Sequence, residues 1–268
     1  MTWARHPVMT DRIHRFDDLD NFRDFGAYDT AAGRRLKTGH LFRAGHQARA
    51  SDADLERLEA LNIATVVDLR RPSERRDQPS RRWTSFDGLV IESELDDGGE
   101  APHMRFLREA ELTPVSGRAF MIDTYKTLPF DEGHLDTFSR YFRALGDSDR
   151  PVLIHCAVGK DRTGTLAALT HHLLGVHRDD MIADYLLTNT AVDLEARAPA
   201  IARQLEKRTG RVASHDAVVA FLGVDAVFLE TALATIIARH GSIDAYLEQA
   251  LGVDAGLRDR IGERLSAA

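Results

Sequence analysis

The stretch of this sequence best suited to chemistry contains a cysteine and an arginine separated by five residues. It runs from His155 to Gly164 and reads HCAVGKDRTG, with the cysteine at Cys156 and the arginine at Arg162. A loop that turns from a strand into a helix can aim successive backbone N–H groups into one concavity, and the helix N-terminus adds partial positive charge. A guanidinium offers a planar fork of donors that matches phosphate oxygens. The spacing therefore predicts a phosphate-binding loop with a nucleophile at its base.

Cys156 is interpreted as that nucleophile. Thiols at helix N-termini beside cations ionise more readily than free cysteine, and the thiolate is the attacking form. Gly159 would let the backbone approach a bound anion with no Cβ in the way. The alternative is a buried structural cysteine, since free cysteine is often buried, but the arginine spacing and the strand-to-helix context favour the nucleophile. The predicted phosphate-binding residues are Ala157, Val158, Gly159, Lys160, Asp161 and Arg162.

Two aspartates could supply the proton that a leaving oxygen needs. Asp161 lies inside the loop beside Arg162. Asp68 ends a predicted strand, and the carboxyl ends of parallel strands face the ligand crevice. Asp161 could instead brace the start of the helix, and Asp68 could be a turn residue at a strand end. The sequence leaves both assignments open.

Three further residues of the loop each allow two interpretations. His155 could act as a base or brace the loop, and bracing is favoured because adjacent residues at a strand end point apart. Lys160 adds a second cation for an anionic ligand, or it is an exposed lysine at a helix start. Thr163 could donate a hydrogen bond to the sulfur, cap the helix, or do both.

The elements that must hold this loop follow an α/β pattern. Strands are predicted at Ala64–Leu69, Pro151–His155 and Gly88–Ile91. Helices are predicted at Ser51–Leu61, Leu135–Leu145, His103–Glu111 and after Cys156, where Leu166, Leu169, Thr170, Leu173 and Leu174 share one face and Gly175 can end the helix. Strands alternating with helices predict a mostly parallel central sheet flanked by helices.

The C-terminal third is predicted to be almost wholly helical from Asp179 onward. The expected helices are Ala191–Lys207, Ala226–His240 and Asp254–Leu265. We expect them to form a helical layer against the sheet. The expected organisation is a single domain over residues 1–268, with a core at 14–190 and a helical C-terminal portion at 191–265.

Two segments are expected to be irregular and to shape the mouth of the site, namely Arg70–Arg82 and Asp96–Glu100. The first carries six arginines, offset only by Glu74 and Asp77. Such a segment is either a rim that steers phosphate or anionic lipid headgroups toward the site, or a solvated loop.

Composition excludes several classes of partner. The net charge of −7 makes a nucleic acid an unsuitable partner. One cysteine permits neither an intrachain disulfide nor a cysteine-rich zinc site, and twelve scattered histidines predict no metal site. Met1–Phe16 lacks the apolar core of a signal peptide and no stretch is long enough to span a membrane, so a cytoplasmic protein is expected, with leaderless export left open.

The loop resembles that of the Cys-x5-Arg phosphatases, and HCAVGKDRTG is similar to the bacterial tyrosine-phosphatase-like family whose loop reads HCxxGKDRTG. Other segments that resemble the family are Asn21–Gly26 (NFRDFG), Leu41–Ala44 (LFRA), Val67–Arg70 (VDLR) and Gly241–Leu247 (GSIDAYL). The resemblance spans roughly residues 14–265. Where the family often has Arg-Ser, this chain has Arg43-Ala44.

The resemblance implies hydrolysis of phosphate monoesters through a cysteinyl-phosphate, with no metal or other cofactor. The implied substrates are phosphoproteins carrying phosphotyrosine, sometimes phosphoserine or phosphothreonine, and phosphoinositides. It points to both aspartates, more strongly to Asp161, and it implies that Lys160 leaves room for a doubly phosphorylated or inositol-type ligand. Asn21 matches a hydrogen-bonded brace near the site, and Arg43 is a second supporting residue. The alternatives are a phosphoinositide phosphatase with little protein activity and a catalytically weak phosphate-binding module.

Overall fold

A five-stranded sheet lies at the centre of the computed structural model, which describes residues 12–95 and 102–267. Its order is β1 (Arg23–Asp24), β3 (Leu41–Ala44), β6 (Val152–His155), β4 (Thr65–Asp68) and β5 (Leu89–Glu92). The last four strands are parallel to one another, and β1 is antiparallel to β3. The predicted α/β class with a mostly parallel sheet is confirmed, and β4, β5 and β6 overlap the three predicted strands.

The carboxyl ends of the parallel strands stand in one row. Ala44, His155 and Asp68 are register partners at the ends of β3, β6 and β4. All four residues of each of these strands are buried, because helices cover both faces of the sheet and leave no room for alternating polar residues. Cys156 follows directly on β6, so the predicted loop emerges at the edge of the sheet where ligands bind in open α/β folds.

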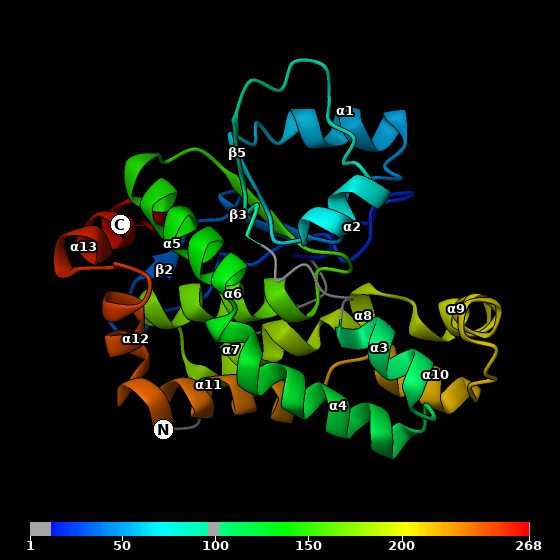
Figure 1. Ribbon diagram of the computed structural model, residues 1–268. Helices are drawn as coiled ribbons and strands as arrows, with labels where there is room; N and C mark the ends of the chain where they lie inside the picture. The colour runs from blue at the N-terminus through cyan, green and yellow to red at the C-terminus, as the bar shows by residue number, and fades with distance from the viewer. Residues whose placement is uncertain (1–11, 96–101, 268) are drawn as a thin grey trace.

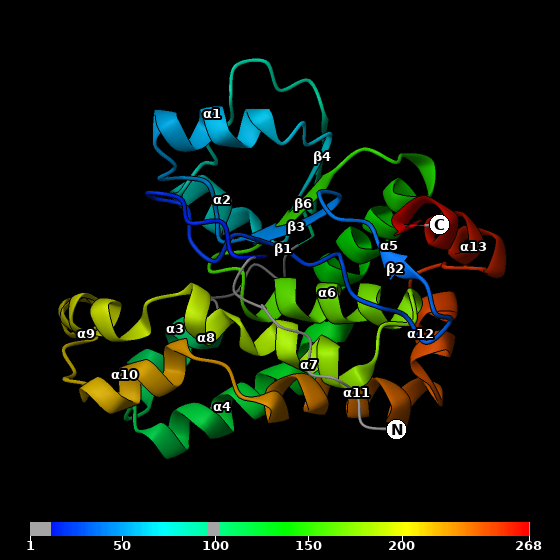
Figure 2. The ribbon, with the colours of Figure 1, turned by 180° about the vertical axis from the view of Figure 1, so that it is seen from behind.

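Helices form a layer on each face of the sheet (Figures 1 and 2). One face is covered by α1 (Asp52–Ala60) and α2 (Pro72–Asp77), the other by α5 (Glu132–Asp147) and α6 (Asp161–Leu173). The helix predicted after Ser51 begins with a capping box, in which Ser51 and Asp54 each accept the other's backbone N–H. The glycine expected to end the helix after Cys156 does so, since Gly175 follows α6 with a φ of +74°.

The remaining helices form a further layer beyond α5 and α6. They are α3 (Pro102–Glu109), α4 (Pro114–Thr127), η2 (Leu128–Phe130), α7 (Arg178–Leu186), α8 (Thr188–Ala191), α9 (Leu194–Thr209), α10 (His215–Leu222), α11 (Ala226–His240), α12 (Ile243–Gln249) and α13 (Ala255–Leu265). The short strand β7 (Ser266–Ala267) follows them and pairs with β2 (Arg35–Leu36).

The expectation that the C-terminal helices lie directly against the sheet is wrong. Among the described elements, α11 packs mainly on α4, α12 and α7, α10 on α4 and α9, and α13 on α5. Helix α6 is buried around most of its circumference, which a helix requires when it is enclosed between a sheet and a second helical layer. Figure 2 shows α6 in that position, between the strands and α7 and α11.

Helix α2 corrects the expectation that Arg70–Arg82 is irregular. Pro72 occupies its first turn, and the backbone N–H of Arg71 donates to the Glu74 carboxylate at 2.8 Å, which is how a helix start satisfies its free donors. The other segment expected to be irregular, Asp96–Glu100, lies outside the described residues. Within the described part of the chain, no single helix is long and apolar enough to cross a membrane, although α10 and α11, bent by 41° at their junction, meet that test as a pair.

Candidate active site

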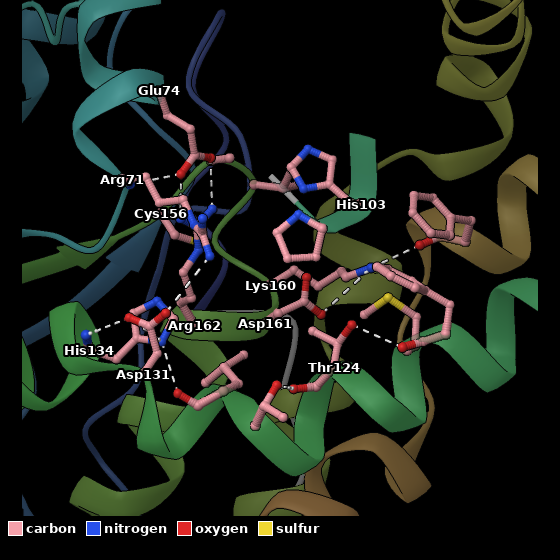
Figure 3. Close-up of a pocket in the computed structure, with 18 of the residues that line it drawn as sticks. Arg71, Glu74, His103, Thr124, Asp131, His134, Cys156, Lys160, Asp161 and Arg162 are labelled. Atoms are coloured by element: carbon pink, nitrogen blue, oxygen red, sulfur yellow. Dashed lines mark hydrogen bonds and ion pairs between the residues drawn. The ribbon is translucent and has the colours of Figure 1, made fainter. Parts of the chain in front are cut away.

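The cysteine loop forms one wall of a cavity of about 530 Å³ (Figure 3). Cys156 is only 3% exposed, yet it lines this cavity. The loop residues that line it are Cys156, Ala157, Val158, Lys160, Asp161 and Arg162. The structure therefore brings together the predicted nucleophile, the predicted phosphate-binding arginine and one of the two predicted proton donors.

Gly159 is required by the backbone of the loop. Its φ of +70° is unfavourable for residues with a side chain. A Cβ at this position would lie 2.3 Å from the backbone oxygen of Ala44. The glycine thus lets the loop pack against the end of β3, and Gly159 is not among the residues lining the cavity.

Two predicted supporting residues, Asn21 and Arg43, donate hydrogen bonds to the backbone of the loop. The side-chain amide of Asn21 donates to the backbone oxygens of Val158 at 3.0 Å and Gly159 at 2.9 Å, and Arg43 Nη2 donates to the latter at 3.0 Å. A planar trans peptide directs its N–H opposite to its C=O. Because these carbonyls point back to Asn21 and Arg43, the N–H groups of Gly159 and Lys160 point toward the opposite side, where the cavity lies.

Asp184 on α7 is a supporting residue that sequence reasoning missed. Its carboxylate lies 2.7 Å from Arg43 Nη1 and 3.5 Å from Arg23 Nε, and all three side chains are buried. Burial opposes its charged form, but Arg23 and Arg43 outweigh burial and lower the pKa of Asp184 to about 2. Asp184 is one of three aspartates in the nine residues of α7, and nothing in the sequence distinguished it from the others or linked it to Arg43.

Glu74 on α2 holds the guanidinium of Arg162 in place. Arg162 Nη1 and Nη2 donate to the two carboxylate oxygens at 2.5 and 2.9 Å, and Nη1 also donates to the Leu69 carbonyl at 3.1 Å. Burial disfavours the charged forms, but mutual attraction outweighs it, raising the pKa of Arg162 and lowering that of Glu74 to about 2. Sequence reasoning counted Glu74 only as an offsetting charge, although its place three residues after Arg71 is a helix-start signal.

Asp161 and Lys160 lie side by side in the cavity wall (Figure 3). Lys160 Nζ donates to the Phe221 carbonyl at 2.9 Å and lies 3.7 Å from Asp161 Oδ1. The same oxygen of Asp161 accepts a hydrogen bond from the Tyr125 hydroxyl at 2.8 Å. Lys160 is therefore not an exposed lysine at a helix start, because its ammonium group is enclosed between α10 and the loop.

Asp68, the other predicted proton donor, is not among the residues lining the cavity. Its buried carboxylate accepts from Arg70 Nε at 2.9 Å and from Arg70 Nη2 at 2.7 Å. Burial favours the neutral acid, but His155 and Arg70 outweigh it and hold the pKa of Asp68 well below its usual range. In this position Asp68 is a buried, ionised partner of Arg70.

His155 and Thr163 are fully buried near Cys156. Burial lowers the pKa of His155 to about 4, so its ring is neutral at pH 7. Its Nδ1 lies 3.5 Å from the Cys156 carbonyl and its Nε2 lies 3.7 Å from Asp68, a placement suited to the favoured bracing role. The Thr163 hydroxyl has no hydrogen-bond partner among the described residues, so neither expected contact of Thr163 is present.

Several arginines of residues 70–82 are paired with acidic side chains, which neither the rim nor the solvated-loop interpretation anticipated. Arg70 is paired with Asp68, Arg75 with Glu92 and Glu94, and Arg81 with Asp52. Of the six, Arg71 lines the cavity, where its guanidinium lies 3.8 Å from Asp131. These pairs tie α2 and the residues on either side of it to β4, β5 and α1, so much of the arginine content has a structural role.

The rest of the cavity wall comes from α2, α3, α4, η2, α5, α10 and α11. Its apolar side chains are Pro102, Phe120, Met121, Leu128, Phe130, Phe221 and Leu222. Polar groups at its edge include His103, His134 and Arg239. Among the residues placed in the structure, no three histidine, cysteine or acidic side chains are grouped so that they could hold a metal ion. The arrangement combines a polar anion site at one wall with an apolar chamber in front of it.

The sequence of this chain is similar to those of known tyrosine phosphatases. A model of the tyrosine phosphatase family matches residues 14–267. A provisionally named tyrosine-protein phosphatase of Cupriavidus necator is 34% identical over 239 residues, covering 89% of this chain and 84% of the relative. The triple specificity protein phosphatase PtpB of Mycobacterium tuberculosis is 33% identical over 260 residues, covering 86% and 91%. A tyrosine-protein phosphatase of Nostoc commune is 28% identical over 149 residues, covering 54% and 47%.

Proposed function

Since the chain belongs to the tyrosine phosphatase family, a family of phosphoric monoester hydrolases, we propose that it acts through a cysteinyl-phosphate formed on Cys156. The observation that carries this proposal is that Cys156, Arg162 and Asp161 line one cavity. Two of these side chains are held by groups that lie outside the loop, Glu74 and Tyr125.

The reaction takes place in two displacements at phosphorus. In the first, the Cys156 thiolate forms a bond to phosphorus while the ester oxygen leaves with a proton from the Asp161 carboxyl. In the second, a water molecule gives a proton back to Asp161 and its oxygen attacks phosphorus, breaking the S–P bond and releasing inorganic phosphate. Arg162 and the loop N–H groups hold the equatorial oxygens as charge spreads over them.

Asp161 is the proton donor in this proposal, and Asp68 is a brace. Asp161 lines the cavity, whereas the Asp68 carboxylate is enclosed and doubly hydrogen-bonded by Arg70. A general acid must reach the leaving oxygen directly or through one water molecule. Of the two aspartates, only Asp161 is placed so that it can reach a leaving oxygen.

The favoured substrate is an aryl phosphate such as phosphotyrosine. An aromatic leaving group fits the apolar wall that Phe120, Phe130 and Phe221 provide in front of the loop. A phosphoinositide would place several hydroxyl groups against that wall without partners, which is unfavourable. Lys160, the cation expected to read a second anionic group, is already engaged by the Phe221 carbonyl. The mycobacterial relative is named a triple specificity phosphatase, which supports a range wider than phosphotyrosine alone, and we extend the proposal to phosphoserine and phosphothreonine.

A substrate panel in the presence of EDTA tests this proposal. We expect turnover of a phosphotyrosine peptide, slower turnover of phosphoserine and phosphothreonine peptides, and least of a phosphoinositide. Cys156→Ser should abolish turnover and trap no phosphate on the protein, while wild type yields a transient phosphoprotein on acid quench. Phosphate binding without turnover by wild type would indicate a phosphate-binding module instead. Preference for the phosphoinositide would overturn the substrate assignment.

The pH–rate profiles of two variants show which of the two aspartates is the general acid. Asp161→Asn should remove the limb of the profile that depends on a protonated acid and lower kcat by about 10²–10⁴-fold on substrates with poor leaving groups. Asp68→Asn should keep that limb and instead lower thermal stability. If Asp161→Asn and Asp68→Asn both retain a complete bell-shaped profile, neither aspartate is the acid.

A further inference from the structure

A pair of buried tyrosines connects the helical layer to Asp161. Tyr125 on α4 is 0% exposed and Tyr185 on α7 is 1% exposed. Their hydroxyl oxygens are 2.7 Å apart, and the Tyr125 hydroxyl also lies 2.8 Å from Asp161 Oδ1. The three groups thus form a chain of hydrogen bonds that ends at the proposed proton donor.

When Oδ1 of Asp161 carries no proton, the chain has one consistent direction. Each tyrosine hydroxyl has a single proton to donate, and the Tyr125 hydroxyl donates its proton to Asp161. The bond between the two tyrosines must therefore be donated by Tyr185. Burial, reinforced by the nearby Asp161 charge, raises the pKa of both tyrosines well above the usual value, so both keep their protons through the working pH range.

This direction distinguishes the two oxygens of Asp161. Oδ1 accepts the Tyr125 hydrogen bond and faces the Lys160 ammonium at 3.7 Å. No hydrogen bond to Oδ2 is present within the described ranges. A proton on Oδ1 would reverse the chain and leave the buried Tyr185 O–H without an acceptor among the described residues, so the acidic proton of Asp161 belongs on Oδ2.

We propose that Tyr125 is a positioning residue for proton transfer: it fixes the Asp161 carboxyl so that Oδ2 carries the proton to the leaving oxygen, and Tyr185 orients Tyr125. The inference rests on the proposed function, because it assigns a role within that reaction. It also gives a reason for Gly164 in the loop motif. A Cβ at Gly164 would lie 2.8 Å from Cδ2 of the Tyr185 ring, so the glycine leaves the space that this tyrosine occupies.

The test measures how strongly the rate depends on the leaving group. For wild type and Tyr125→Phe, kcat/KM is measured on aryl phosphates whose phenols span a wide range of acidity. Poor leaving groups need the acid most, so we expect kcat/KM of Tyr125→Phe to fall about tenfold on these substrates. This loss is part of the rate enhancement of about 10²–10⁴-fold that acid catalysis supplies. On the aryl phosphate with the most acidic phenol, kcat/KM of the same variant should be nearly unchanged. The rate of the variant should therefore depend more steeply on the leaving group than that of wild type.

Tyr141→Phe is the matched control. Tyr141 is also a fully buried tyrosine with a single side-chain hydrogen bond, 3.0 Å from the Thr170 hydroxyl, and it is not among the cavity-lining residues. We expect it to leave the leaving-group dependence unchanged, whatever its effect on thermal unfolding. Tyr185→Phe should shift the dependence in the same direction as Tyr125→Phe, but less.

A double-mutant cycle separates positioning of Asp161 from a general structural effect. In the Asp161→Asn background, Tyr125→Phe should cause no further loss on poor leaving groups. An equal loss on every substrate, or losses that multiply with those of Asp161→Asn, would overturn the inference. These outcomes are distinct from failure of the proposed function, which would appear as wild type inert toward all the aryl phosphates or as undiminished turnover by Cys156→Ser.

Discussion

The residues that perform the proposed chemistry are each oriented by a side chain distant in sequence. Glu74 fixes Arg162, Tyr125 binds Asp161, and Asn21 draws two loop carbonyls away from the cavity. Each partner is wholly or largely buried, where an electrostatic contact is stronger than in water and the geometry is held by packing. Preorganised donors of this kind cost no reorganisation when charge develops on the phosphoryl group.

His155 provides a prediction about stability and pH. Burial lowers its pKa to about 4 from an ordinary value of 6.5. The unfolded chain therefore binds a proton at this site near pH 6.5, while the folded chain resists it down to about pH 4. Protonation favours the unfolded state across that window, so stability should fall as pH drops, with His155 contributing roughly 3 kcal/mol. His155→Asn should flatten this dependence.

Urea unfolding at several pH values between 7 and 4 measures that slope. Exposed His215, which lies in a surface pair with Glu195, offers the control variant His215→Asn. If the His155 variant follows the wild-type slope after correction for its own stability at pH 7, the buried neutral histidine is not the cause.

At the scale of elements, the short helix α2 links the sheet to the site. It follows β4, and its Glu74 reaches Arg162 on α6. The bonds of Arg75 to Glu92 and Glu94, at the end of β5 and just beyond it, secure the helix from the other side. The position of the phosphate-binding guanidinium therefore depends on how α2 is attached, and not on the cysteine loop alone.

Glu74→Gln tests that dependence, because the variant keeps the shape of the side chain and removes its charge. Hydrogen bonds to charged groups contribute about 1.5–3 kcal/mol, so we expect kcat/KM to fall by about 10–100-fold as Arg162 loses its fixed orientation. Glu230→Gln is the control, since Glu230 on α11 pairs with Arg178 on α7, takes no part in attaching α2, and is not among the cavity-lining residues. Equal activities of Glu74→Gln and wild type would show that Arg162 orients itself without α2.

At the scale of the whole molecule, the C-terminal helices complete the site. One hydrophobic core joins side chains of the sheet, α5 and α6 to side chains of α11, α12 and α13. Helix α10 contributes Phe221 and Leu222 to the cavity wall, and the Phe221 carbonyl accepts the Lys160 hydrogen bond. We propose that the chain folds as one unit, with no separable core at residues 14–190.

A chain that ends at residue 190 tests this organisation. The loss of α9 to α13 would expose the apolar faces of α4 to α7. We therefore expect this shortened chain to show no cooperative thermal transition and no phosphatase turnover. Differential scanning calorimetry and turnover of a phosphotyrosine peptide measure the two. A shortened chain that unfolds cooperatively and keeps its activity would show that residues 191–268 are an appendage.

The sequence by itself determined the family and the class of fold. Cys156 and Arg162 lie within one short loop, so their spacing is visible without any tertiary contact, and the alternation of strands and helices is likewise local. Helix α2 was not predicted, because its six residues, most of them charged, show no helical spacing of apolar side chains. Asn21 and Arg43 were identified through family resemblance, and the structure supplies their contacts with the loop.

Only the tertiary structure decided which groups surround the reacting atoms. Asp68 and Asp161 look equally suitable in sequence, and they differ because Arg70 encloses one while the other lines the cavity. Glu74, Tyr125 and Asp184 lie far along the chain from the residues they hold. Contacts between distant segments depend on how helices pack across a sheet, and such packing leaves no local pattern from which a partner could be read.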